Sequence, residues 1–276
     1  MASDDRPSAR PAQVWHVTPS RRDRRDDVTA AEEPLEIRLQ GTSFVVTMRT
    51  PGADRELAAG FLLAERIITS VADIRSITHC TDTPDLGNVL DVTLNGDALE
   101  RATAILTHRR LVSVTSACGV CGRRSIEDLM TALPRVSSGP PVAESLISSL
   151  PAKLRAAQPL FEETGGLHAA GLFTGDGAIV GAAEDVGRHN AVDKVIGAAV
   201  LAGALPLADH LLFVSGRTSF EIVQKAVVAG VPIVASVSAP SSLAVELAGD
   251  AGVTLIGFVR GDTFNIYTSP ERIHAC

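Results

Sequence analysis

The sequence predicts an α/β protein of two domains, an N-terminal α+β domain followed by a C-terminal layered α/β domain. The chain has 276 residues, of which 45% are hydrophobic, and this is enough to bury a sizeable core. Prolines accumulate between residues 133 and 161 and interrupt the periodic pattern there. Beyond that stretch, apolar strand-like runs alternate with segments of helical periodicity, as in layered α/β folds.

These patterns divide the chain into four parts. Residues 1–32 are dense in charge and almost lack periodic apolar positions, so we expect a mobile tail there. Residues 33–135 are expected to form the N-terminal α+β domain, and residues 136–160 a linker with short helices. Residues 161–276 are expected to form the C-terminal α/β domain.

In the N-terminal domain, alternating apolar residues predict two strands joined by a turn at Gln40 and Gly41. Asp54 suits the cap of a helix whose apolar positions recur at helical spacing as far as Ile68. Further strands are expected at residues 74–78, 89–94 and 102–106.

The C-terminal domain is expected to begin with an extended pair of strands and to continue as a regular alternation of helices and strands. The pair covers residues 166–173 and 178–183. Helices are expected at residues 190–202, 220–229 and 243–251, and strands at 211–214, 233–236, 254–259 and 265–267.

Charge, hydropathy and cysteine usage exclude several classes of protein. A net charge of −7 argues against a surface that coats nucleic acid. The first residues lack the apolar segment of a secretory signal, and the longest weakly polar stretch is shorter than the ~20 residues that a membrane span needs. Four scattered cysteines do not form the disulfide framework of a small secreted domain. We therefore expect a cytoplasmic protein with no nucleic-acid or membrane partner.

The segment richest in chemistry is the loop at residues 116–128, in which Cys118 and Cys121 lie three positions apart between glycines. A thiol reacts as its thiolate, which is favoured near a helix N-terminus and near cations such as Arg123 and Arg124. Sulfur chemistry at this loop is therefore the favoured interpretation.

Two other interpretations of the cysteine pair stay open from the residues alone. The pair could be half of a structural zinc site, but zinc needs two more ligands and there is no second Cys-x-x-Cys. The spare candidates are His79 with Cys80 and His274 with Cys276, in distant and dissimilar contexts. A thioredoxin-like dithiol would be expected near the start of a βαβ unit, which is not evident here.

Three loops of the C-terminal domain follow expected strands and are rich in polar groups, at residues 184–190, 215–219 and 258–263. Ligands of α/β sheets bind beyond the carboxyl ends of the strands, where loops meet helix N-termini. Together the loops predict an anion pocket within an acidic protein. Taken singly, the second loop is better explained by helix capping, His189 is equally well explained as structural, and His168 is taken as structural.

Four motifs in a fixed order make the chain similar to a known family. They are SACGVCG at 116–122, EDVGRHNAVDK at 184–194, SGR at 215–217 and GFVRG at 257–261. TPG at 50–52 and ELAAGFL at 56–62 add to the likeness. Over roughly residues 30–276 the chain resembles the formate dehydrogenase accessory sulfurtransferase family, often called FdhD.

This resemblance implies a sulfurtransferase enzyme. Such a protein accepts sulfur as a persulfide from a cysteine desulfurase and passes it to the molybdenum of bis(molybdopterin guanine dinucleotide), which formate dehydrogenase needs for activity. Cys118 is the expected persulfide carrier and Cys121 an assisting or relay thiol. The alternative is a non-enzymatic chaperone of the guanine dinucleotide cofactor, with the two thiols in a structural zinc site or a redox pair.

The resemblance also assigns a cofactor site to the C-terminal domain. The residues expected to contact the cofactor are Phe258, Val259, Arg260, Gly261, Asp262, Thr263, Arg188, His189, Lys194, Ser215, Gly216 and Arg217. Their cations could neutralise its phosphates, and Asp193 or Asp262 could read guanine N–H donors. The expected partners are the desulfurase, formate dehydrogenase and the guanine dinucleotide moiety, and binding so large a ligand suits a homodimer.

The family's second domain is similar in fold to cytidine deaminases. The deaminase zinc signature is missing from this sequence, because His168 is followed by Ala169 and Ala170, and no cysteine lies between Cys121 and Cys276. We therefore expect neither deamination nor an intrinsic metal.

Overall fold

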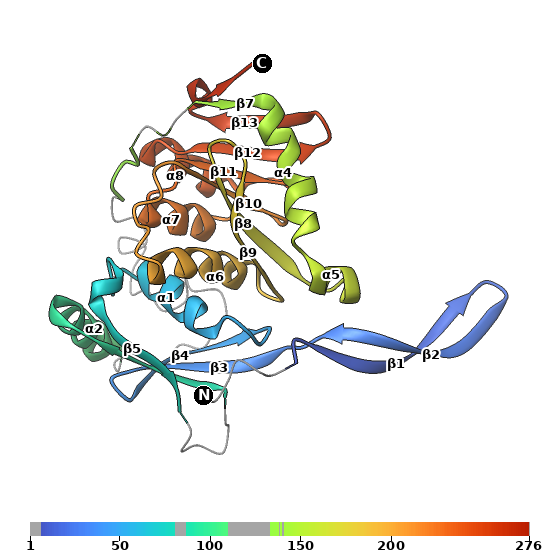
Figure 1. Cartoon of the computed structure of the whole chain (residues 1–276), viewed down its shortest axis with the longest axis horizontal. Coiled ribbons are helices and arrows are strands. Elements are labelled where there is room, and N and C mark those ends of the chain that lie inside the picture. Colours follow the sequence, from blue (N-terminus) through green and yellow to red (C-terminus); the bar gives the residue numbers. More distant parts are fainter. Residues whose placement is uncertain (1–6, 81–86, 110–132, 138, 140, 276) are drawn as a thin grey trace.

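The computed structural model describes residues 7–80, 87–109, 133–137, 139 and 141–275. They form a mixed α/β structure from which a β-hairpin projects as an arm (Figure 1). The N-terminal elements are β1 (Ala9–Thr18), β2 (Arg21–Ala30), β3 (Glu33–Leu39), β4 (Thr42–Arg49), α1 (Asp54–Ala64), β5 (Ile74–His79), β6 (Val89–Leu94) and α2 (Gly96–Arg109). Then come β7 (Val142–Ala143), α4 (Glu144–Ala156), α5 (Pro159–Thr164), β8 (His168–Thr174), β9 (Ile179–Asp185), α6 (Arg188–Leu201), β10 (His210–Val214), α7 (Phe220–Ala229), β11 (Ile233–Ser236), α8 (Ser242–Ala251), β12 (Thr254–Arg260), β13 (Thr263–Thr268) and β14 (Ile273–His274).

The N-terminal half is built on a four-stranded sheet of order β4-β3-β6-β5. The predicted β3–β4 pair is confirmed, and Gln40 and Gly41 both take the positive φ that its tight turn requires. Alternate side chains of β3, namely Leu35, Ile37 and Leu39, are fully buried against the core.

Two sequence predictions in this half are wrong. Residues 102–106 belong to α2 and not to a strand; Ala98 and Ala102, four positions apart, are both buried on one face of that helix. A short apolar run is ambiguous in periodicity, and the strong helix propensity of alanine decides here. Asp54 is the first residue of α1 and not its cap, and its carboxylate binds the buried Arg49 guanidinium at 2.8 Å.

The prediction of a mobile tail is also wrong for residues 9–30, because they form the antiparallel hairpin β1–β2. Both faces of this hairpin are largely in solvent, so its sequence needs no apolar stripe and shows none. In place of apolar contacts, the hairpin is stabilised by ion pairs such as that of Arg25 with Asp23, at 2.9 Å. The guanidinium groups of Arg22 and Arg24 also lie over the Trp15 ring.

The C-terminal half contains a mixed six-stranded sheet of order β13-β12-β11-β10-β8-β9. Its central strands β10, β11 and β12 are parallel, so their carboxyl ends share one edge of the sheet. Helices α6, α7 and α8 cover one face and α4 covers the other (Figure 1). The expected strands and helices of this half are confirmed, with shifts of a few residues at their ends.

The two halves share one hydrophobic core through close contact of α1 with α6 (Figure 1). Gly60 of α1 and Gly197 of α6 lie at this crossing. A Cβ atom on Gly60 would be 2.0 Å from the backbone oxygen of Asp193, and one on Gly197 would be 1.8 Å from that of Glu56. Only glycine fits at either position without moving a helix.

Candidate functional site

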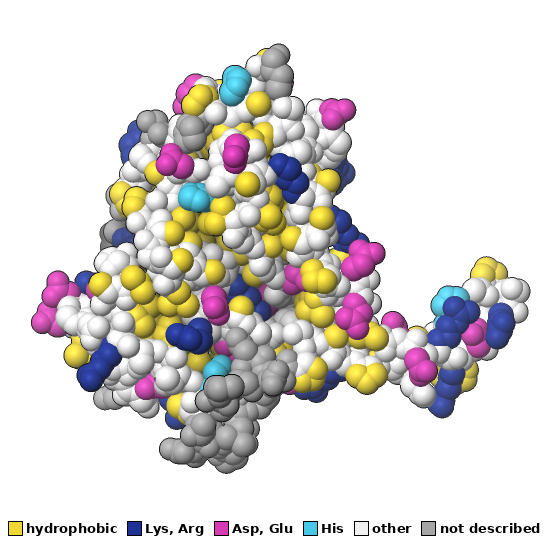
Figure 2. Space-filling view, in the orientation of Figure 1, with side chains coloured by type: hydrophobic (Ala, Val, Ile, Leu, Met, Phe, Trp, Pro, Cys, Tyr) yellow, Lys and Arg dark blue, Asp and Glu magenta, His cyan; other side chains and the backbone are white. Residues whose placement is uncertain are grey.

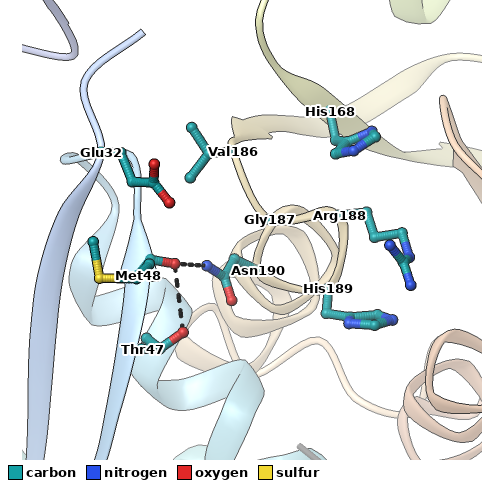
Figure 3. A pocket seen from close by; sticks show the side chains of 9 residues that line it. All are labelled: Glu32, Thr47, Met48, His168, Val186, Gly187, Arg188, His189 and Asn190. Atoms are coloured by element: carbon teal, nitrogen blue, oxygen red, sulfur yellow. Dashed lines mark hydrogen bonds between the residues drawn. The ribbon is translucent and has the colours of Figure 1, made fainter. Parts of the chain in front are cut away.

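The described part of the molecule has a cavity between the two halves, with a volume of about 340 Å³ (Figure 3). Cys118 and Cys121 lie outside the described residues, as do Arg123, Arg124 and the helix expected to follow them. The cavity is therefore the candidate site within the described residues. It is lined by Glu32, Thr47, Met48, His168, Val186, Gly187, Arg188, His189 and Asn190.

The buried Asp185 carboxylate, at the end of β9, holds the loop beside the cavity in place. It accepts hydrogen bonds from the backbone N–H of Gly187 at 2.8 Å and of Thr50 at 3.2 Å, and from Asn190 Nδ2 at 3.0 Å. Asn190 Nδ2 also donates to the backbone oxygen of Met48 at 2.8 Å, which Figure 3 shows as a bridge between the halves. These bonds fix where α6 begins, with its N-terminus at the cavity wall.

Lys194 has a structural role and not the predicted role of binding a phosphate. Its side chain is 3% exposed, and its Nζ lies 2.8 Å from Asp185 Oδ2 and 2.8 Å from the backbone oxygen of Thr50. The ammonium therefore compensates a buried carboxylate. Asp193 is one of the two residues expected to accept hydrogen bonds from guanine. Both its carboxylate oxygens already accept hydrogen bonds from Lys225 Nζ, at 2.8 and 2.9 Å.

Burial disfavours the charged form of Lys225, but the carboxylates of Asp193 and Glu221 outweigh burial and raise its pKa. The Asp193–Lys225 pair joins α6 to α7 inside the protein. Both side chains are buried and bind each other, so neither is free to contact a ligand.

The second predicted loop lies beside two residues of the cavity, His168 and Arg188. A Cβ atom on Gly216 would lie 3.4 Å from His168 Nδ1 and 3.9 Å from Arg188 Cδ, so the missing side chain leaves room beside both. Ser215 exchanges hydrogen bonds with Ala169, its Oγ accepting from that backbone N–H at 2.8 Å. Ser215 thus anchors the loop to β8.

Arg188 is the cation best placed to bind an anion here. Its Nε is buried from solvent and has no hydrogen-bond partner among the described residues. A buried N–H donor without a partner destabilises the folded protein until a ligand or a water molecule accepts a hydrogen bond from it. Figure 3 shows the Arg188, His168 and His189 side chains on one side of the cavity, away from Glu32. Burial, and next the Arg188 charge, lower the pKa of the half-buried His168.

His189 links the start of α6 to the start of α7. Its Nε2 lies 2.9 Å from Ser219 Oγ, and its Nδ1 lies 3.3 Å from Glu221 Oε2. Burial lowers the pKa of His189 to about 3, and the charges of Lys225 and Arg188 act in the same direction. A neutral ring brings no charge to the cavity, so the positive charge there comes from Arg188 and the N-terminus of α6.

We expect the His189 ring to keep constant ¹⁵N chemical shifts between about pH 5 and 8, because its depressed pKa keeps it neutral throughout that range. Two-dimensional ¹H–¹⁵N spectra of the imidazole region measure this directly. The same ring in the urea-unfolded chain should titrate near pH 6.5 and serves as the control. A midpoint near that value in the folded protein would contradict the neutral assignment.

The third predicted loop does not line the cavity. It is the turn between β12 and β13, at the same edge of the sheet, where Phe258 has a φ of 56° and Arg260 lies 5.8 Å over the Phe258 ring. Val259 points into the core and is fully buried, so its side chain is not a ligand contact. Thr263 Oγ1 donates to the Arg260 backbone oxygen at 3.1 Å, and Gly261 supplies the positive φ of the turn.

The remaining predicted ligand residues lie on the surface of these loops. Arg217 and Asp262 are exposed, and Arg260 is exposed at the end of β12. The β11–α8 loop separates the second loop from the third: Thr218 donates its N–H to Ala239, and Phe258 donates to Ser238. The first loop therefore lines the cavity, the second lies beside two of its residues, His168 and Arg188, and the third lies two strands away.

Four cavity residues have no counterpart in the sequence prediction, namely Glu32, Thr47, Met48 and His168. The first three lie in the N-terminal half, and no local pattern links them to α6. His168 carried a usable signal, because it is the first residue of β8 and pairs with Asp185 at the end of β9. A polar residue at a strand end beside a polar loop is a better site candidate than one in mid-strand.

No group of three or more His, Cys, Asp or Glu side chains in the described ranges could hold a metal ion. No helix in those ranges is long and apolar enough to cross a membrane.

The chain is similar over nearly its whole length to proteins already known. The model of the FdhD/NarQ family matches residues 30–274. "Sulfur carrier protein FdhD" of Nocardia farcinica is 49% identical over 95% of this chain and 94% of its own length. The protein of the same name from Anaeromyxobacter sp. (strain K) is 54% identical over 90% of this chain and 88% of its own length.

A solved structure supports the same relationship. It is described as a formate dehydrogenase accessory protein from Desulfotalea psychrophila and is 27% identical in sequence. It superposes with a TM-score of 0.76 over 97% of this chain and 100% of the other.

Proposed function

Since the chain belongs to the FdhD/NarQ family, we propose that it is a sulfur carrier and acts as a sulfurtransferase. The observation that carries this proposal is the extent of the likeness. The family match at residues 30–274 includes the Cys118–Cys121 loop and every residue that lines the cavity. Two relatives named sulfur carrier protein FdhD match 95% and 90% of this chain.

In the proposed reaction, the Cys118 thiolate attacks the outer sulfur of a persulfide on a cysteine desulfurase. A new S–S bond forms on Cys118, the S–S bond of the donor breaks, and the donor cysteine leaves as a thiolate. The sulfur moves without a net change in oxidation state. Arg123 and Arg124 would favour the anionic forms of Cys118 and its persulfide, and Cys121 would assist or relay the sulfur.

The proposed acceptor is the molybdenum of bis(molybdopterin guanine dinucleotide), which this protein would bind as a substrate for later use by formate dehydrogenase. The cavity suits an anionic portion of that substrate. The unpaired Arg188 Nε, the α6 N-terminus and the space at Gly216 offer donors and room for a phosphate. Arg217 and Arg260 on the neighbouring loops would extend the contact to a second phosphate.

Several finer predictions belong to this proposal. They are a cytoplasmic location, the desulfurase and formate dehydrogenase as partners, and a C-terminal half similar to cytidine deaminases.

The proposal is tested by reconstitution. The purified protein is loaded with a desulfurase and cysteine, then mixed with formate dehydrogenase that lacks its sulfido ligand. We expect formate oxidation to appear, and its absence would overturn the proposed function.

We expect an Arg188→Gln variant to bind guanosine diphosphate about 10- to 100-fold more weakly, because a charge-assisted hydrogen bond to a phosphate contributes about 1.5–3 kcal/mol. Isothermal titration calorimetry measures the affinity. Arg75→Gln, at an exposed position on β5, removes the same charge far from the cavity and is the matched control. Equal affinities of the two variants would show that the cavity is not the nucleotide site.

A further inference from the structure

Ser219 is the N-cap residue of α7, but its side chain does not cap that helix. Its φ of −93° and ψ of 169° are those of an ordinary N-cap, at which a serine oxygen accepts a hydrogen bond from the first turn. Ser241, at the start of α8, does this, with Oγ accepting from Ala244 N at 3.3 Å. Helix capping therefore does not account for the Ser219 hydroxyl.

The Ser219 hydroxyl instead contacts a histidine that lies against a carboxylate. Ser219 Oγ is 2.9 Å from His189 Nε2, and His189 Nδ1 is 3.3 Å from Glu221 Oε2. Hydroxyl, imidazole and carboxylate thus follow one another in the order of a serine nucleophile, its general base and the group that orients the base. The contact of the ring with the carboxylate is longer than in a formed triad, as is common before a substrate binds.

The carboxylate of this cluster is held by a buried cation. Glu221 Oε1 lies 3.2 Å from Lys225 Nζ, one turn along α7, and the Lys225 side chain is 3% exposed. Glu221 Oε2 is buried and has no hydrogen-bond partner among the described residues. This oxygen is therefore available to the N–H of His189 Nδ1 when the ring takes up a proton.

Donors for a developing oxyanion lie beside the hydroxyl. The first intrahelical hydrogen bond of α7 runs from Val223 N to the Ser219 oxygen. The backbone N–H groups of residues 220–222 therefore have no acceptor within the helix. These groups carry the positive end of the helix dipole, and α7 has 10 residues. Backbone N–H groups next to a nucleophile are the usual donors to the oxygen of a tetrahedral intermediate.

A substrate can reach this cluster from the cavity. His189 lines the cavity, and Ser219 is partly exposed. Figure 3 shows the Arg188 side chain on the same side of the cavity as the His189 ring. Over the body of the protein, Figure 2 shows Lys and Arg side chains interspersed with Asp and Glu on one face. A negative group on a substrate would thus be bound by a local cation, and Arg188, whose Nε lacks a partner among the described residues, is suitably placed.

We propose that Ser219 is the nucleophile of an acyl-transfer site, with His189 as general base and Glu221 as the residue that positions it. The substrates are small carboxylic esters that carry a negative group, which binds Arg188. This activity goes beyond sulfur transfer and uses none of the cysteines.

The proposed reaction has two steps. Ser219 Oγ attacks the carbonyl carbon of the ester while its proton passes to His189 Nε2, and the bond to the alcohol then breaks as the alcohol takes that proton. Water attacks the acyl-serine in the same way and releases a carboxylic acid and the free Ser219 hydroxyl. Water is the only other reactant, and nothing is oxidised or reduced.

The protonation state of the ring decides how fast each step runs. Burial lowers the pKa of His189 to about 3, so Nε2 is free to accept a proton at neutral pH. A base with so low a pKa accepts that proton slowly. We therefore expect acylation of Ser219 to be easier to detect than rapid turnover.

Covalent labelling tests the nucleophile in the full chain. Cys118→Ala/Cys121→Ala is the background, so that the thiols of that loop cannot react. Diisopropyl fluorophosphate, a reagent for activated serines, should add one group to the intact mass, located on the Ser219 peptide. Ser219→Ala and His189→Gln should stay unlabelled, and Ser241→Ala, which removes a serine that does cap its helix, should label fully. An unlabelled background protein, or equal labelling after Ser219→Ala, would overturn the proposal.

Ester cleavage tests the roles of the other residues in the same background. With 4-nitrophenyl hydrogen succinate, we expect a burst of one nitrophenolate per chain, absent from Ser219→Ala. Glu221→Gln should lower kcat about tenfold or more and leave KM unchanged, as expected for a residue that positions the base. Arg188→Gln should raise KM about tenfold for this ester and leave that for neutral 4-nitrophenyl acetate unchanged. A burst that persists in Ser219→Ala would contradict the assignment. Sulfur loading of Cys118 in the native chain is measured separately, so either activity can fail without the other.

Discussion

A Cys118→Ala variant is expected to lose all ability to activate formate dehydrogenase while keeping its fold. The reason is chemical, because alanine has no sulfur atom on which a persulfide can form. The measurement is the rate of formate oxidation by the dehydrogenase after incubation with loaded carrier, which should fall to the level without carrier. Circular dichroism should match that of the native chain.

Cys80→Ala provides the matched control for this loss. Cys80 follows β5, is partly buried and is the only free cysteine in the described ranges. Its removal should leave activation within about twofold of the native rate, because small surface changes away from a site have little effect. Activation that survives alanine at both Cys118 and Cys121 would contradict the carrier mechanism.

A Gly197→Ala variant should be strongly destabilised, by about 3 kcal/mol or more, because the added methyl group overpacks a helix crossing. The new Cβ would lie 1.8 Å from the backbone oxygen of Glu56, which no side-chain rotation can relieve. The two helices must move apart, and α6 carries Arg188 and His189 at its start. Urea denaturation should show the lower free energy of unfolding, and nucleotide affinity should fall with it.

Gly249→Ala is the matched control for this substitution. Gly249 is also helical, in α8, but its nearest neighbour to an added Cβ is Thr268 Cγ2 at an ordinary 3.7 Å. Alanine has a higher helix propensity than glycine, so this variant should be stabilised by about 0.5–1 kcal/mol. A lower free energy of unfolding for Gly197→Ala and a higher one for Gly249→Ala would support the close packing of α1 on α6. Equal and small effects would contradict it.

The periodicity of the sequence predicts the C-terminal half well because its strands are short apolar runs and two of its helices, α7 and α8, end at the glycines Gly230 and Gly252. The prediction at residues 102–106 failed because a mainly apolar segment of five residues is too short to distinguish a strand from a helix. The arm was missed for a different reason. A hairpin solvated on both faces has no buried stripe, so its charged residues look like those of a tail.

The candidate site was predicted in part. The polar loops after β9 and β10 do meet, since the strands that carry them share an end of the sheet. The role of Lys194 could not be read from its position in the motif, because its partners Asp185 and Thr50 are brought to it by packing of the two halves. For the same reason Thr47 and Met48 of β4 were not recognised as lining the cavity.

Mass spectrometry of the intact protein after incubation with a cysteine desulfurase and cysteine tests the central claim most directly. The account predicts a gain of one sulfur atom, located on the Cys118 peptide, removed by a thiol reductant and absent from Cys118→Ala. An unchanged mass, with one zinc ion bound per chain and an inert thiol pair, would contradict it and favour a cofactor chaperone with a structural metal.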